Sequence, residues 1–287
     1  MDGCFKQVCF NVLFLSFGLL SCQNESKSDF KSSVVDSGDD PNFKIEANDN
    51  SRFQGFDRKV EVFGISIFAV PKVENQKLLH AANVMAQYLD NDEDGKVDNH
   101  LVLDAMLENQ AFMVMWSSED DIDALELPDG GIGQDLGNDE TVPDYVAKGK
   151  KGRFDASLEE VLHLITNAGY AYAYPQIFGE HDGSSLADAM DIARGGAFKK
   201  IPNQYPATAW FTYDDETCEY NCQMTEYIYW ALTSILGAQV NRREEIDNEW
   251  KLYSREKVEE TDKAIFALLT NYEYKFPTIL PDGTYKR

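Results

Sequence analysis

The clearest pattern of apolar and polar positions lies in residues 154–175, FDASLEEVLHLITNAGYAYAYP. Successive residues of an α-helix turn by about 100°, so its apolar residues gather on one side of a single predicted helix. They are Leu158, Val161, Leu162, Ile165, Ala168, Gly169 and Tyr172. The opposite side carries Glu159, His163 and Asn167 at i, i+4 spacing, and Glu160 precedes His163 by one turn. The pattern predicts an amphipathic helix that places a histidine between carboxylates.

Other segments show the periods of regular structure. Residues 60–70 alternate and are β-branched, which predicts one strand ended by Pro71. Residues 75–89 have apolar positions at helical spacing. The remaining expected elements are helices at 101–107, 119–125 and 185–194, a helical region from 241, strands at 111–116 and 210–213, and a glycine-rich loop at 128–139. This order predicts a helix-dominated α+β fold with a small sheet.

Composition supports a folded domain with an acidic surface. The chain has 287 residues, of which 43% are hydrophobic and 12% aromatic, so it can bury a sizeable core. We expect a single domain over residues 51–287. The formal net charge of -24 argues against nucleic acid or an anionic membrane surface as a partner.

The first 22 residues have the pattern of a targeting segment. An apolar run from Val8 to Leu20 is too short for a comfortable membrane span. It ends in Leu-Leu-Ser-Cys, which resembles the lipobox of bacterial lipoproteins. The resemblance implies export, lipidation of Cys22 and a membrane contact through the lipid only. The alternative is an ordinary secretory signal. Residues 23–50, polar and without periodicity, are predicted to be a flexible tether.

Residues 90–98, DNDEDGKVD, resemble the first nine positions of an EF-hand calcium loop. The resemblance implies four side-chain ligands and one backbone carbonyl. These are Asp90, Asp92, Asp94 and Asp98, with the carbonyl of Lys96. Position 12 is Leu101 where a bidentate Glu is expected, so a remote ligand or water would complete the shell. Because five acids in nine residues repel one another, we expect calcium here, and the alternative is an acidic turn without an ion.

The run Glu159-Glu160-Val161-Leu162-His163 resembles the HExxH helix of zincin metallopeptidases, with Glu in place of the first His. The resemblance implies that Glu159 and His163 hold zinc and that Glu160 is the general base. Gluzincins take a third ligand from a Glu on a later helix, and Glu226 in TEYIYWALTSILG matches that position. One His with two carboxylates is a harder and weaker zinc site than two His with one carboxylate.

A zincin-like domain would make the chain a metallohydrolase, with a peptide or protein as substrate and Tyr170 or Tyr229 as a donor to the oxyanion. Three alternatives remain open. Ser157 and Glu160 also form a capping-box sequence, which would occupy Glu160. The site would then be structural, in a non-catalytic lipoprotein that binds a partner. A di-iron centre would need a second Glu-x-x-His, which the sequence lacks.

Cys218 and Cys222 are the only cysteines outside the targeting segment. Their spacing and the exported context favour a disulfide over a zinc knuckle. Side chains this far apart on a regular helix diverge, so the bridge is expected in a turn before the helix that carries Glu226.

Overall fold

The computed structural model describes residues 35–287 except 119, 122–124 and 126. The described residues form the expected helix-dominated α+β fold with a small mixed sheet. The targeting segment with Cys22 lies outside them, as does most of the helix expected at 119–125. Within the described ranges, no helix has both the length and the apolar content to cross a membrane.

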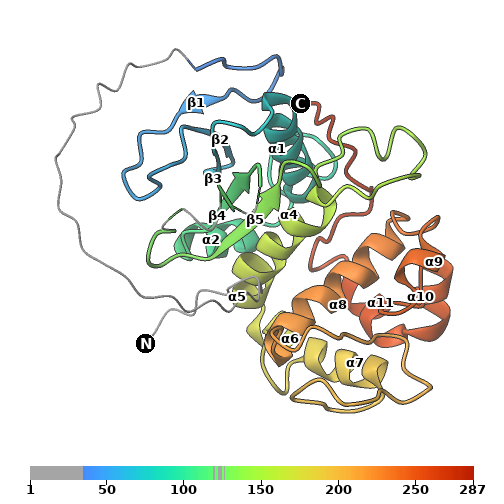
Figure 1. The fold of residues 1–287 in the computed structure, drawn as a ribbon. Coiled ribbons are helices and arrows are strands. Elements are labelled where there is room, and N and C mark those ends of the chain that lie inside the picture. Colours follow the sequence, from blue (N-terminus) through green and yellow to red (C-terminus); the bar gives the residue numbers. More distant parts are fainter. Residues whose placement is uncertain (1–34, 119, 122–124, 126) are drawn as a thin grey trace.

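The sheet has five strands in the order β1-β2-β3-β4-β5 (Figure 1). The strands are β1 Glu46–Ala47, β2 Arg58–Val62, β3 Ile65–Ala69, β4 Phe112–Trp116 and β5 Gly133–Gly137. The first three are antiparallel, and β4 and β5 join β3 in parallel. A parallel neighbour requires a long crossover, and the helices between β3 and β4 supply it.

Two sequence predictions about the sheet were wrong. The segment 60–70 is not one strand but part of a hairpin, because Phe63 and Gly64 take φ values of 49° and 89° and form a tight turn. The glycine-rich segment contains β5, in which Leu136 is fully buried. Gly133 suits this strand because a Cβ there would lie 2.5 Å from the ring of Phe112 on β4.

Of the three helices near the sheet, two pack on its strands and on each other, and the third packs on residues 166–173. α1 spans Asn75–Leu89, the range that the sequence predicts, and it contacts both β2 and α4. α2 spans His100–Glu108, and α4 spans Ser157–Ile165 and packs on β5. Figure 1 shows α4 between the sheet and the C-terminal helices.

The predicted helix at 154–175 is continuous but not uniform. α4 is followed by a π-helical turn, Thr166–Tyr170, and by α5, Ala171–Ala173. In this turn Gly169 faces α2, where a Cβ would lie 2.7 Å from the side chain of Val102. A π turn winds extra backbone into the helix, so later residues change direction. Tyr172, predicted to face the core, is therefore 56% exposed.

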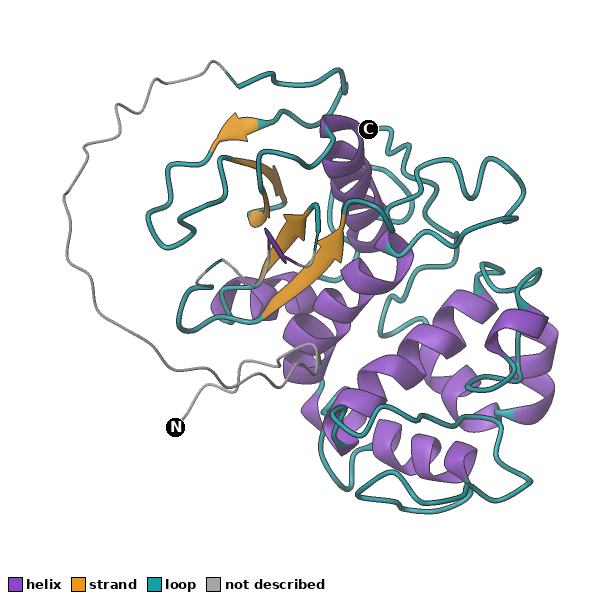
Figure 2. Cartoon of the chain, in the orientation of Figure 1, coloured by secondary structure: helices purple, strands orange, loops and turns teal. Residues whose placement is uncertain are grey.

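The C-terminal part is built from helices, which Figure 2 shows gathered away from the strands. They are α6 Pro175–Phe178, α7 Ser185–Arg194, α8 Tyr220–Ile235, α9 Arg243–Ile246, α10 Arg255–Thr261 and α11 Lys263–Leu269. The strand expected at 210–213 is reduced to one bridge between Phe211 and Trp250. One continuous set of buried apolar side chains joins these helices to the sheet and its helices.

The ends of the described chain pack against α1. Phe43 and Ile45 are buried and β1 pairs with β2, so the part of the predicted tether after residue 35 belongs to the folded body. The prediction placed the start of the domain at 51 because residues 23–50 are polar and without periodicity. From the other end, the backbone N–H of Tyr285 donates to Asn83 on α1.

Candidate metal centre

The hydrogen bonds at the start of α4 are made by the side chain of Asp155 and not by the glutamates of the helix. Asp155 is buried and accepts hydrogen bonds from the Ser157 hydroxyl at 2.7 Å and from the Val142 N–H at 2.9 Å. His80 also contacts Asp155, with 2.7 Å between Nε2 and Oδ2. The capping-box alternative was wrong: Glu160 accepts a hydrogen bond from Gln134 on β5 instead of folding back to Ser157.

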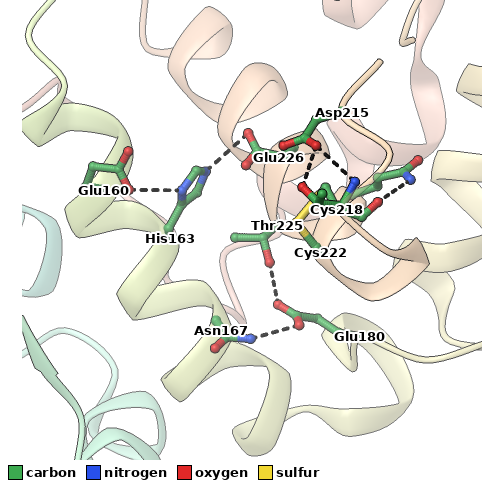
Figure 3. The surroundings of a disulfide bond; sticks show 11 residues. Glu160, His163, Asn167, Glu180, Asp215, Cys218, Cys222, Thr225 and Glu226 are labelled. Atoms are coloured by element: carbon green, nitrogen blue, oxygen red, sulfur yellow. Dashed lines mark hydrogen bonds and ion pairs between the residues drawn. A yellow bond between two sulfur atoms is a disulfide. The ribbon is translucent and has the colours of Figure 1, made fainter. Parts of the chain in front are cut away.

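Each ring nitrogen of His163 faces a carboxylate. Nδ1 lies 3.5 Å from Oε2 of Glu160, and Nε2 lies 3.6 Å from Oε2 of Glu226. Figure 3 shows the two glutamates on opposite sides of the imidazole. His163 is 5% exposed, and within the described part of the chain its Nε2 has no hydrogen-bond partner. The imidazole is thus buried between two acids, with one nitrogen unsatisfied.

The structure brings together all four residues that the sequence singles out. One ligand atom each from Glu159, Glu160 and His163 lie within 4.8 Å of one another. Glu226 reaches this group from α8 through its approach to His163, because α4 and α8 pack together. The expected convergence of the two helices is therefore present.

Burial dominates the electrostatics of the three glutamates. It raises the pKa of Glu159 to about 7, with further repulsion from Glu160. It raises the pKa of Glu226 to about 8, an effect that His163 partly offsets. Burial and repulsion from Asp135 also raise the pKa of Glu160. Poorly solvated carboxylates that repel one another are stabilised by a proton or a cation. The donor set and the unsatisfied nitrogen fit a divalent metal ion.

A cavity of about 350 Å³ opens beside the cluster. Glu159 and Glu226 form part of its wall, together with Arg242 and two further glutamates, Glu245 and Glu249. No motif in the sequence singles out these last three residues, because they lie just before, in and just after α9, far from the α4 motif. The sequence around them is acidic and amphipathic, and its pattern does not differ from that of an ordinary solvent-exposed segment.

The two tyrosines proposed as oxyanion donors have different surroundings. Tyr229 lines the cavity, and its hydroxyl accepts hydrogen bonds from Gln239 and Arg242 at 3.4 Å each. Tyr170 instead donates to the Tyr274 carbonyl at 3.0 Å and stacks on Phe276. Tyr170 is therefore held in the core and is not among the residues that line this cavity.

Helix α8 is held at its start and against α4. Cys218 and Cys222 form the expected disulfide, with Cα atoms 5.3 Å apart. α8 begins at Tyr220, so the bridge crosses the helix start and does not lie before it as predicted. This geometry is possible because Cys218 is still outside the helix.

A polar link joins α8 to the π turn. Glu180 accepts hydrogen bonds from Thr225 at 2.6 Å and from Asn167 at 2.8 Å (Figure 3). Thr225 immediately precedes Glu226, and Asn167 lies one turn after His163. The link therefore fixes the spacing of the two helices beside the metal-ligand candidates.

The acidic loop after α1 has a compact turn. One oxygen each from Asp90, Asp92 and Asp94 lie within 4.8 Å of one another. Asp90 is fully buried and accepts the backbone N–H of Gly95 at 2.8 Å. Asp98 accepts the N–H of Asn91 at 2.7 Å.

Two further positions of the EF-hand pattern have side chains that are not metal ligands. The side chain of Lys96 pairs with Asp94 at 3.1 Å, and Leu101 is 58% exposed at position 12. The Tyr285 hydroxyl contacts Asp90 from the C-terminal segment. Three of the four expected side-chain ligands, Asp90, Asp92 and Asp94, are thus close to one another, at a point where α1 meets the end of the described chain.

No protein-family model, curated protein or solved structure matches this chain. Its function is therefore inferred from its own residues and their contacts.

Proposed function

We propose that the protein is a metal-dependent hydrolase of zincin type, with a peptide or protein substrate. Glu159, His163 and Glu226 hold the metal, and zinc is the ion that the resemblance to gluzincins implies. The observation that supports this function best is the unsatisfied Nε2 of His163, buried and 3.6 Å from Glu226 on another helix.

An imidazole nitrogen that faces a carboxylate needs a positive charge between the two groups, because two lone pairs repel each other. A proton on Nε2 or a metal ion meets this need. A proton alone would make a hydrogen bond, yet the N–O distance of 3.6 Å is longer than the usual 2.7 to 3.2 Å or so. Metal–ligand bonds of about 2.0 to 2.2 Å bring two ligand atoms to roughly 3 to 4 Å from each other. The spacing therefore favours the metal.

The bound ion would supply a Lewis acid beside the cavity. The side chains around it have distinct tasks. Glu160 accepts the proton of the attacking water, and Gln134 orients its carboxylate through a hydrogen bond to Oε2. Tyr229, whose hydroxyl is oriented by Gln239 and Arg242, donates to the developing oxyanion.

We further propose that the loop of Asp90, Asp92, Asp94, Lys96 and Asp98 binds calcium and stabilises the end of α1. The proximity of the first three carboxylates supports this role. In the proposed protein, lipidation of Cys22 anchors the domain to a bacterial membrane after export, and the lipobox-like sequence supports that proposal.

Metal analysis of the purified protein tests the hydrolase proposal. We expect about one zinc ion per chain in the wild type and a loss of zinc, with calcium retained, in the His163→Ala and Glu226→Gln variants. Glu260→Gln, which removes an exposed glutamate of α10, is the control. Calcium alone in the wild type would refute the hydrolase and favour a partner-binding lipoprotein, and iron would favour a di-iron centre.

A further inference from the structure

The cavity beside the metal-ligand candidates has an excess of negative charge. Its wall carries the carboxylates of Glu159, Glu226, Glu245 and Glu249 and a single guanidinium, that of Arg242. Arg242 pairs with Glu245, with 2.6 Å between Nη2 and Oε1. The positive charge of this wall is thereby matched by one of its four carboxylates.

Glu249 remains without an ionic partner. Two carboxylates, Glu159 and Glu226, match the charge of the proposed divalent ion. Among the described residues, none forms an ion pair with Glu249 within 4.0 Å. Its backbone is fixed, because its carbonyl accepts the N–H of Thr212 at 2.8 Å beside the Phe211–Trp250 bridge. Burial, followed by repulsion from Asp214, raises the pKa of Glu249. A cation bound beside Glu249 would offset both the cost of burying its negative charge and the repulsion from Asp214.

The same cavity has aromatic walls. Tyr213 and Trp230 both line it, and ring faces attract ammonium and guanidinium groups. A volume of about 350 Å³ is at the lower end of the range for ligand pockets, roughly 300 to 1,000 Å³. The cavity also adjoins the metal-ligand candidates: Glu226 is part of its wall, and Nε2 of His163, buried and unsatisfied among the described residues, faces Glu226.

We propose that this cavity binds a cationic group of the substrate, an ammonium or a guanidinium, against Glu249 with Tyr213 and Trp230 as aromatic walls. The substrate class, a basic peptide, rests on the hydrolase function proposed above. Binding of the cation itself does not, because Glu249 is outside the proposed ligand set. Glu249 is thus a specificity-determining residue of the site.

Calorimetric titration of the purified full chain with two isosteric probes tests this proposal. The probes are Nα-acetylarginine amide and Nα-acetylcitrulline amide, which have similar shapes and differ in the charge of the side chain. We expect the arginine probe to bind at least about tenfold more tightly than the citrulline probe. Glu249→Gln should remove this preference, and Glu249→Asp should keep most of it.

Two controls separate the cavity from its surroundings. Glu260→Gln removes the same charge from the exposed surface of α10 and should leave the preference unchanged. Thermal melting of each variant confirms that the fold is retained. Equal binding of the two probes to the wild type, or an unchanged preference in Glu249→Gln, would overturn the proposal.

The outcomes also separate this inference from the hydrolase. A zinc-loaded protein that binds both probes equally refutes the cation site and leaves the hydrolase standing. A protein that contains no zinc but prefers the arginine probe through Glu249 supports the cation site and refutes the hydrolase.

Discussion

In the metal-free protein, Glu226 makes stability depend on pH. Its pKa is raised from 4.5 to about 8, chiefly by burial. Between these two pH values the folded protein keeps a proton that the unfolded chain has already released. The contribution of Glu226 to stability is therefore fully present below pH 4.5 and is lost as the pH rises to about 8.

The size of this effect follows from the two pKa values. Each pKa unit corresponds to about 1.4 kcal/mol, so the difference between 4.5 and about 8 corresponds to roughly 5 kcal/mol. This is a large part of the free energy of unfolding of an ordinary domain, about 5 to 15 kcal/mol. A metal ion bound to the ionised carboxylate would remove the penalty, so its affinity should rise over the same pH range.

Urea unfolding measures this dependence. The protein is freed of zinc with 1,10-phenanthroline, kept in excess calcium, and unfolded at several values between about pH 5.5 and 8.5. Relative to Glu226→Gln, which has no carboxylate to titrate there, the wild type should lose stability by up to about 1.4 kcal/mol per pH unit. Glu260→Gln should follow the wild type. If the stability of the wild type and that of Glu226→Gln have the same pH slope, Glu226 does not keep a proton in the folded protein over this pH range.

Three further predictions concern the other proposed sites. Calcium at a hundredfold excess over its Kd should stabilise the fold by about 2.7 kcal/mol, and an unchanged melting temperature between calcium and chelator contradicts a calcium site at Asp90. Glu160→Gln should lower kcat by at least about 100-fold with zinc content unchanged, whereas loss of zinc would show that Glu160 acts on the metal site. Intact mass should place a lipidated Cys22 at the mature N-terminus, and a product that retains earlier residues rules this out.

Helical periodicity gave the most accurate part of the sequence prediction. The segments 75–89 and 185–194 match α1 and α7 residue for residue. Both have regular apolar spacing and end at a residue that stops a helix: Asp90 opens the acidic turn, and Gly195 takes a φ of 74°. The approach of Glu226 to His163 was also predictable, because a carboxylate on an aromatic helix needs a partner.

The parts that the sequence did not predict depend on contacts between distant segments. The strand β5 has one buried apolar side chain of large size, Leu136, so its place in the sheet depends on β4 rather than on its own pattern. Gln134 reaches Glu160 only because its strand pairs with β4. Glu249 became part of the cavity only through the packing of the helices around it. Such residues have no local signature.

The π turn at Thr166–Tyr170 also affects how distances along this chain are counted. The N–H of Ala171 bonds to the carbonyl of Thr166, five residues earlier, so this turn contains one residue more than an α-helical turn. The extra residue lies after His163 and before Glu226, and therefore leaves the rotational phase of Glu159 and His163 untouched. A search for related chains by a fixed interval between the two motifs must therefore allow one residue more or less at this point.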